Sequence, residues 1–203
     1  MKYINLSVPI TADMPVYPGD PKTKIIQAGE LQKDGFEVHI LSMLNHSGTH
    51  IDAPSHMIEG GKSLDKFPLE AFVGRGVYIK IEEATFDLDS LKQSDIQKDD
   101  IVLFHTGMSD HANKSTYFEE YPAIPQNVAE YLVEKQVKMV GVDTYSVDHE
   151  QFIAHKILLQ HDILILENLT SLEALADKQF MIYAFPLNLS LDGSPVRAVA
   201  EIA

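Results

Sequence analysis

Four metal-ligating side chains lie in one short segment, residues 46–56, which reads His-Ser-Gly-Thr-His-Ile-Asp-Ala-Pro-Ser-His. Imidazole and carboxylate groups are ligands that suit zinc and neighbouring divalent metals. Gly48 weakens a helix and Pro54 breaks one, so we expect a loop or strand end here rather than a continuous helix. Such a segment can turn several side chains toward one point, which predicts a metal site. The four side chains are those of His46, His50, Asp52 and His56.

A second pair of candidate ligands follows later in the chain. His155 lies in a helix predicted over 148–160, and Glu167 directly follows a strand predicted over 163–166. The two residues lie 12 positions apart, a spacing that suits a helix–turn–strand connection that brings their side chains together. On the residues alone, an exposed helix histidine and a strand-end carboxylate are the alternative interpretation.

The elements that position these side chains alternate between strands and helices. Short runs rich in Val and Ile predict buried strands, and amphipathic spacing predicts helices. Thr170 to Glu173 has the pattern of a capping box that opens a short helix through Ala176. Strands mixed with helices imply an α/β domain. The predicted strands are 36–43, 76–81, 101–105, 139–142 and 163–166, and the longer helices are 126–137 and 148–160.

Size and composition fit one globular domain. The chain has 203 residues, of which 45% are hydrophobic, enough for a substantial core. Its net charge of −14 disfavours nucleic acid as a partner, because phosphate binding needs clustered Lys and Arg. No apolar run approaches the length of a membrane span, and no secretory signal is visible, so we expect no membrane partner and a cytoplasmic location. The absence of cysteine excludes disulfides, thiolate metal sites and cysteine nucleophiles.

The metal motif resembles the signature of the cyclase family of metal-dependent hydrolases, which includes the bacterial kynurenine formamidases. Shorter similarities extend the resemblance nearly from end to end. The resemblance implies a swivelling β/β/α fold within a single domain over 1–203, a topology that periodicity alone does not show. The shorter similarities are Leu6-Ser7 and the segments 15–20, 105–107, 141–144, 167–169 and 192–197.

The resemblance also implies two divalent metals per subunit. His46, His50 and Asp52 are then ligands of the first metal, and His155 and Glu167 are ligands of the second. Asp52 bridges both, which a carboxylate can do because it has two oxygens. We expect zinc, with manganese as the second choice.

His56 resembles the family's general acid/base, a group close to the metals but not bound to them. Imidazole suits this role because its unperturbed pKa is about 6.5. The alternative is that His56 is itself a ligand.

The implied activity is hydrolysis of a small amide substrate, with arylformamidase cleavage of N-formylkynurenine to kynurenine and formate as the first expectation. Tyr17 occupies the position where bacterial kynurenine formamidases typically carry a Trp that contacts the aromatic substrate, and this chain has no Trp. That departure keeps a ring-opening hydrolase of the isatin hydrolase kind as the alternative.

A metal-binding protein without catalysis is a third possibility, and the extra His56 argues against it, since structural zinc sites are closed by their ligands. The resemblance further implies at least a homodimer.

Overall fold

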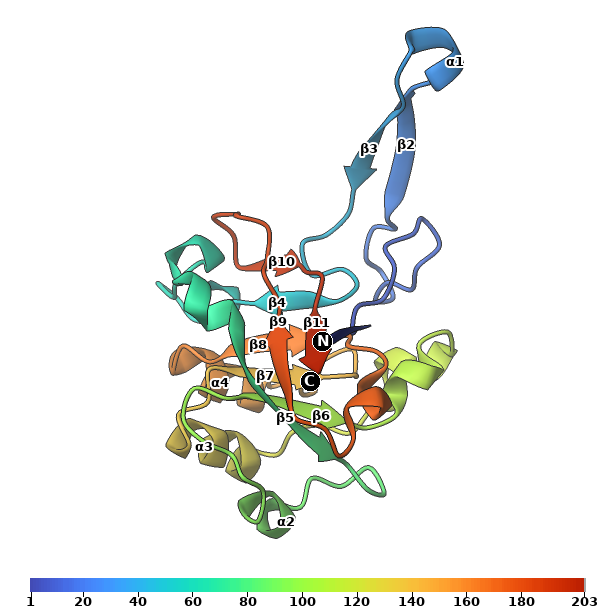
Figure 1. Ribbon diagram of the computed structural model, residues 1–203. Helices are drawn as coiled ribbons and strands as arrows, with labels where there is room; N and C mark the ends of the chain where they lie inside the picture. Colours follow the sequence, from blue (N-terminus) through green and yellow to red (C-terminus); the bar gives the residue numbers. More distant parts are fainter. Residues whose placement is uncertain (203) are drawn as a thin grey trace.

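One nine-stranded sheet organises the computed structural model, which describes residues 1–202. Four central strands run parallel, and antiparallel strands extend the sheet on both sides. The sheet curls, so that its two edges rise in front of and above the parallel centre (Figure 1). The strand order is β1 (Lys2–Asn5), β11 (Val199–Ile202), β9 (Phe180–Tyr183), β5 (Val73–Lys80), β6 (Ile101–His105), β7 (Met139–Val142), β8 (Leu164–Glu167), β4 (His50–Asp52) and β10 (Gly193–Pro195).

The central strands are buried on both faces. In β6, Val102 and Phe104 belong to the core beneath the helices, whereas Ile101 and Leu103 belong to the core on the opposite face. Parallel strands that are covered on both faces are continuously apolar in sequence, and for this reason they could be predicted as buried strands. The mixed α/β class expected from the sequence is therefore confirmed. The covering helices are α2 (Leu88–Lys92), α3 (Gln126–Glu134) and α4 (Ile153–Gln160).

Short 3₁₀ helices occupy many of the connections. One of them follows β4 and carries His56 at its end. Within the described residues, no helix combines the length and apolarity that crossing a membrane requires. The 3₁₀ helices are η1 (Pro54–His56), η2 (Leu64–Lys66), η3 (Leu69–Phe72), η4 (Met108–His111), η5 (Ser115–Phe118) and η6 (Leu172–Leu175).

A hairpin arm projects from the body of the molecule (Figure 1). It consists of β2 (Lys24–Gly29), the single-turn helix α1 (Leu31–Asp34) and β3 (Val38–Ser42). The strand predicted over 36–43 exists as β3, but the prediction that it is buried is wrong, because all five of its residues are exposed. Its Val and Ile residues favour the strand conformation, but they do not lie in the core of this chain.

Two helix starts differ from the sequence prediction. The helix predicted from residue 148 begins at Ile153, because Gln151 and Phe152 have positive φ angles of 82° and 50°. The predicted capping box is wrong: η6 begins after Ser171, which has a φ of 58° and makes no side-chain capping hydrogen bond.

Candidate metal centre

The short strand β4 delivers two of the predicted ligands to one face of the sheet. Residues two apart on a strand point the same way, so His50 and Asp52 face the centre while Ile51 packs in the core. Glu167 at the end of β8 lies directly opposite His50 in the antiparallel register. The His50 Nε2 atom lies 3.3 Å from Asp52 Oδ1 and 3.4 Å from Glu167 Oε2. All three side chains are almost completely buried.

A turn folds His46 back over β4. Gly48 has a φ of +64°, in the left-handed region that glycine adopts without a steric penalty. The reversal brings His46 Nδ1 to 2.7 Å from Asp52 Oδ1.

Helix α4 contributes His155, which faces Asp52 and Glu167. Its Nε2 atom lies 3.4 Å from Glu167 Oε1 and 3.8 Å from Asp52 Oδ2. Asp148 accepts hydrogen bonds from the backbone N–H groups of Ala154 and His155 in the first turn. Its second oxygen lies 2.6 Å from His155 Nδ1, so one carboxylate fixes both the helix start and the imidazole.

Each of the three histidines facing Asp52 has its remaining ring nitrogen held by an oxygen acceptor. Where a metal ion occupies the centre, this outer oxygen, which can only accept, holds the hydrogen on the ring nitrogen that faces it, and the lone pair of the inner nitrogen is available to the metal. This arrangement is typical of metal-ligating histidines. The acceptors are Asp192 Oδ2 for His46 Nε2 (2.9 Å), the Gly48 carbonyl for His50 Nδ1 (2.8 Å) and Asp148 Oδ1 for His155 Nδ1 (2.6 Å).

The electrostatics of the centre favour a cation. Burial raises the pKa of Asp52, but the surrounding histidines outweigh burial and hold that pKa well below its ordinary value. Burial lowers the pKa of His50, yet the charges of Asp52 and Glu167 more than offset it and raise the pKa to about 10. Two buried carboxylates therefore draw positive charge into the site, as protons on imidazole or as a metal ion. The nitrogen and oxygen donors present fit a divalent metal of the zinc or manganese type.

The described residues contain two groups of three side chains whose ligand atoms lie within 4.8 Å of one another. Asp52 belongs to both groups. His56 belongs to the first, a position that fits both a proton-transfer group beside a metal and the alternative role of a ligand. The groups are His46, Asp52 and His56, and His50, Asp52 and Glu167.

Asp192 is a site residue that the sequence analysis did not single out for a role. It directly precedes β10, which pairs with β4. Its Oδ2 atom lies 2.9 Å from His46 Nε2 and 3.1 Å from His56 Nδ1. Burial raises the pKa of Asp192, but hydrogen bonds from the two histidines outweigh it and lower that pKa to about 2. The segment 192–197 was part of the family resemblance, yet nothing in its spacing connects it to a motif 136 residues away.

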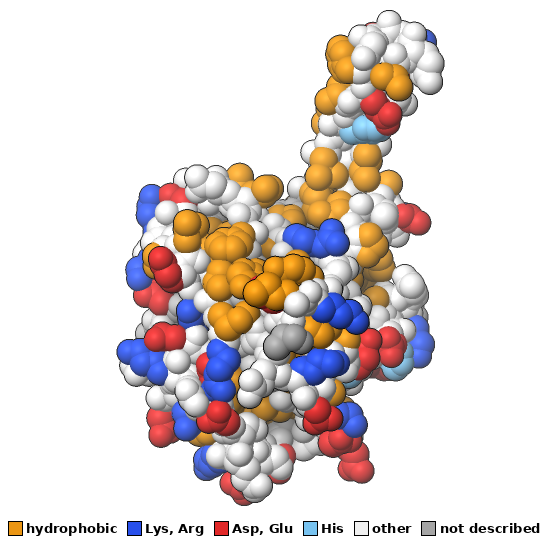
Figure 2. Space-filling view, viewed as in Figure 1, with side chains coloured by type: hydrophobic (Ala, Val, Ile, Leu, Met, Phe, Trp, Pro, Cys, Tyr) orange, Lys and Arg blue, Asp and Glu red, His pale blue; other side chains and the backbone are white. Residues whose placement is uncertain are grey.

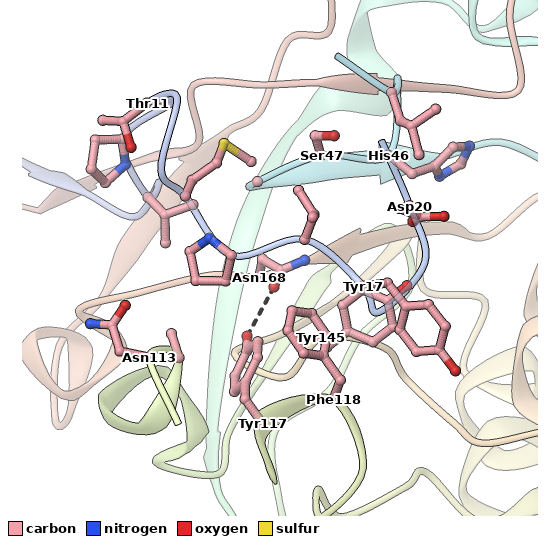
Figure 3. Close-up of a pocket in the computed structure, with 18 of the residues that line it drawn as sticks. Thr11, Tyr17, Asp20, His46, Ser47, Asn113, Tyr117, Phe118, Tyr145 and Asn168 are labelled. Carbon is pink, nitrogen blue, oxygen red and sulfur yellow. Dashed lines mark hydrogen bonds between the residues drawn. The ribbon is translucent and has the colours of Figure 1, made fainter. Parts of the chain in front are cut away.

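A cleft of about 540 Å³ opens over the centre, and Tyr17 lines it. The Tyr17 ring stacks on Tyr145 at 5.3 Å and meets the edge of Phe118 at 5.9 Å. Figure 3 shows these rings side by side beneath His46, on the wall of an adjoining chamber of about 290 Å³. The chamber and the cleft adjoin each other, because both are lined by Tyr17, Asp20, His46, Phe118 and Tyr145.

Comparison with known proteins identifies the family of this chain. The family model described as "Putative cyclase" matches residues 4–149, well over half of the chain. The chain belongs to the cyclase family. A kynurenine formamidase of Bacillus thuringiensis subsp. konkukian (strain 97-27) is 33% identical over 210 residues, which cover 98% of this chain and 97% of the relative.

Solved structures resemble this cyclase-family protein over nearly its whole length. A predicted metal-dependent hydrolase from Bacillus stearothermophilus is 30% identical with a TM-score of 0.78, covering 98% of this chain and 97% of the other. Isatin hydrolase A from Labrenzia aggregata is 26% identical with a TM-score of 0.86, covering 98% and 93%. The expected fold is confirmed, and the chain is placed among the cyclase-family hydrolases.

Proposed function

We propose that this protein is a binuclear metal-dependent amidohydrolase, with N-formylkynurenine as the first candidate substrate. The observation that carries the proposal is the placement of the two oxygens of Asp52. Oδ1 faces His46 at 2.7 Å and His50 at 3.3 Å, whereas Oδ2 faces His155 at 3.8 Å. A carboxylate shared in this way suits two neighbouring cations, the first held with His46 and His50 and the second with His155 and Glu167. We propose zinc for both positions, with manganese as the second choice.

When bound, divalent metals supply Lewis acidity toward a carbonyl oxygen and lower the pKa of water from 15.7 toward about 7. His56 then accepts a proton from the water that attacks the carbonyl carbon and returns it to the leaving nitrogen. The imidazole is suited to this exchange because its Nδ1 is held by Asp192 and it lines the cleft. Neither a serine nor a cysteine nucleophile is required.

Tyr17 is the proposed contact for the aromatic part of the substrate. Its ring is partly exposed to the cleft and is backed by Tyr145, which keeps it in place for stacking. A tyrosine offers less stacking area than the Trp expected in a kynurenine formamidase. For that reason, and because isatin hydrolase A has a similar structure, ring-opening hydrolysis of a small cyclic amide is the second candidate.

Turnover of N-formylkynurenine beside isatin tests the proposal, on protein whose metal content is quantified in the same preparation. We expect two metals per chain and faster cleavage of the formyl amide. Preference for isatin with two metals bound would keep the hydrolase and replace the substrate. Two metals without turnover of either compound would reject both substrate assignments, and protein that binds fewer than two would reject the binuclear site.

We further propose that the protein acts as a homodimer. Its arm exposes apolar side chains on both faces, including Ile25, Ile26 and Ile40. A two-stranded hairpin is at best marginally stable by itself in water, so a partner surface is expected to cover it. The same chain offers a second apolar surface on the segment between β9 and β10, where Phe185, Leu187 and Leu191 are exposed. Figure 2 shows hydrophobic side chains along the arm and on the body beneath it.

A further inference from the structure

Asp192 touches two histidines that the proposed function gives different tasks. His46 is a proposed metal ligand, and His56 is the proposed proton-transfer group. A single oxygen of Asp192, Oδ2, lies 2.9 Å from His46 Nε2 and 3.1 Å from His56 Nδ1. A carboxylate oxygen has two lone pairs, so it can accept both hydrogen bonds at once.

The other contacts of Asp192 fix where that oxygen lies. Its second oxygen, Oδ1, accepts a hydrogen bond of 2.8 Å from the Asn45 side-chain amide. Its backbone carbonyl accepts a hydrogen bond of 2.8 Å from the N–H of Ala53, immediately after β4. Asp192 is therefore anchored through its carboxylate to Asn45, directly before the metal motif, and through its backbone to Ala53 within the motif.

The two imidazoles pack closely beside this carboxylate. The rings of His46 and His56 lie 4.1 Å apart between centroids and are inclined by 31°. Gly193, the residue after Asp192, makes room for the His46 ring, because a Cβ atom there would lie 2.5 Å from His46 Cε1. Close approach of the β10 backbone to the His46 ring is thus part of the arrangement.

From these contacts we propose that Asp192 is a positioning residue that couples the first metal ligand to the proton-transfer group. By accepting from His46 Nε2–H, it leaves Nδ1 of that ring to the metal shared with Asp52. By accepting from His56 Nδ1–H, it leaves Nε2 of that ring for proton exchange with the substrate. The inference rests on the proposed function: its His46 half rests on the metal site, and its His56 half rests on amide hydrolysis.

Metal affinity tests the His46 half. The variants are Asp192→Ala and Asp192→Asn in the full chain, with Zn²⁺ titrated against a chromophoric chelator. Outer hydrogen-bond partners of metal ligands typically contribute ~10–100-fold in affinity. We expect Asp192→Ala to weaken one of the two zinc sites by about that factor and to leave the other unchanged. Asp192→Asn, whose amide carbonyl still accepts, restores part of the loss. Asp89→Asn is the matched control, because that side chain is 89% exposed on α2.

A mutant cycle tests the His56 half on the zinc-loaded enzyme. His56→Ala alone is expected to lower kcat by ~10²–10⁴-fold while keeping both metals. If Asp192 acts through His56, adding Asp192→Ala to His56→Ala at saturating zinc lowers kcat no further. In the presence of His56, Asp192→Ala lowers kcat with little change in KM.

Two results would overturn the inference. Equal zinc affinity in Asp192→Ala and the unmodified protein would reject the link to His46, and multiplicative losses in the cycle would reject the link to His56. Loss of zinc in His56→Ala would make His56 a ligand, which contradicts its proposed task but leaves the affinity test of Asp192 intact. Absence of any amide turnover would reject the proposed function, and zinc affinity would still decide whether Asp192 positions His46.

Discussion

At the scale of single residues, the chemistry converges on Asp52. This carboxylate is 1% exposed and is surrounded by the imidazoles of His46, His50 and His155. A buried anion of this kind is costly unless it is paired, and here every partner is also a potential metal ligand. The two carboxylate oxygens of Asp52 therefore organise the site, and the histidines are arranged around them.

Replacing Asp52 by Asn tests the bridging role. The amide has one carbonyl oxygen and one NH₂ donor, so it cannot offer an oxygen to each of two cations. We expect Asp52→Asn to lose at least one metal and nearly all turnover, measured by elemental analysis and substrate hydrolysis on the same sample. Asp89→Asn serves as the control for loss of one negative charge. Retention of both metals by Asp52→Asn would contradict the bridge.

Some of these residues could be predicted from the sequence and others could not. One short segment contains His46, His50, Asp52 and His56, so the residue types and their spacing predicted a metal site there. His155 and Glu167 needed the family resemblance as well as the expected helix–strand connection. Asp192 reaches the site only because β10 pairs with β4, and no local pattern encodes a pairing between segments so far apart.

At the scale of elements, local sequence again predicts some features, whereas features that depend on distant parts of the chain are missed. β6, β7 and β8 were predicted because buried parallel strands are continuously apolar. The start of α4 was missed because Gln151 and Phe152 adopt left-handed conformations, which their residue types disfavour. The exposure of β3 was missed because apolar content does not reveal which surface covers a strand.

The contact between β10 and His46 makes a prediction about that element. Adding a methyl group at Gly193 would bring a Cβ atom within 2.5 Å of the His46 ring, so the ring or the strand must move. Overpacking of this kind typically costs ~1–3 kcal/mol, and we expect Gly193→Ala to lose that much stability together with zinc affinity.

Chemical denaturation and chelator competition measure the two effects of Gly193→Ala. Gly74→Ala in β5 is the control, because its added Cβ would meet neighbours at 3.2 Å and lies outside the metal centre. A Gly193→Ala protein with unaltered zinc affinity would show that the His46 ring has room to shift without consequence.

At the scale of the whole molecule, the centre links stability to pH. The pKa of His50 is raised to about 10 in the folded protein, compared with about 6.5 when unfolded. A raised pKa means that this contribution to stability is complete below about pH 6.5 and is lost as the pH rises toward 10. Metal binds the deprotonated imidazole, so it replaces the proton increasingly well as the pH rises.

We therefore expect the gain in melting temperature on adding Zn²⁺ to increase between pH 6 and pH 8. The measurement is thermal unfolding with and without a chelator across that range. The metal-free protein alone should become less stable over the same interval. A metal-induced gain that does not change with pH would contradict the linkage between protons and metal at this centre.

Assembly is the remaining property of the whole molecule, and the arm gives it a specific test. Ile26 on β2 lies directly opposite Ile40 on β3, and both side chains are at least half exposed. Replacing them together by Ile26→Glu and Ile40→Lys keeps a favourable cross-strand pair while removing the apolar surface. If the arm of one subunit packs on the body of another, we expect this double variant to be monomeric at concentrations where the unmodified protein is dimeric, as measured by analytical ultracentrifugation.

The equivalent pair on the other face, Ile25→Glu with Leu41→Lys, then shows whether one or both faces are covered. An unmodified protein that sediments as a monomer would reject the dimer, and the exposed hairpin would then need a different partner.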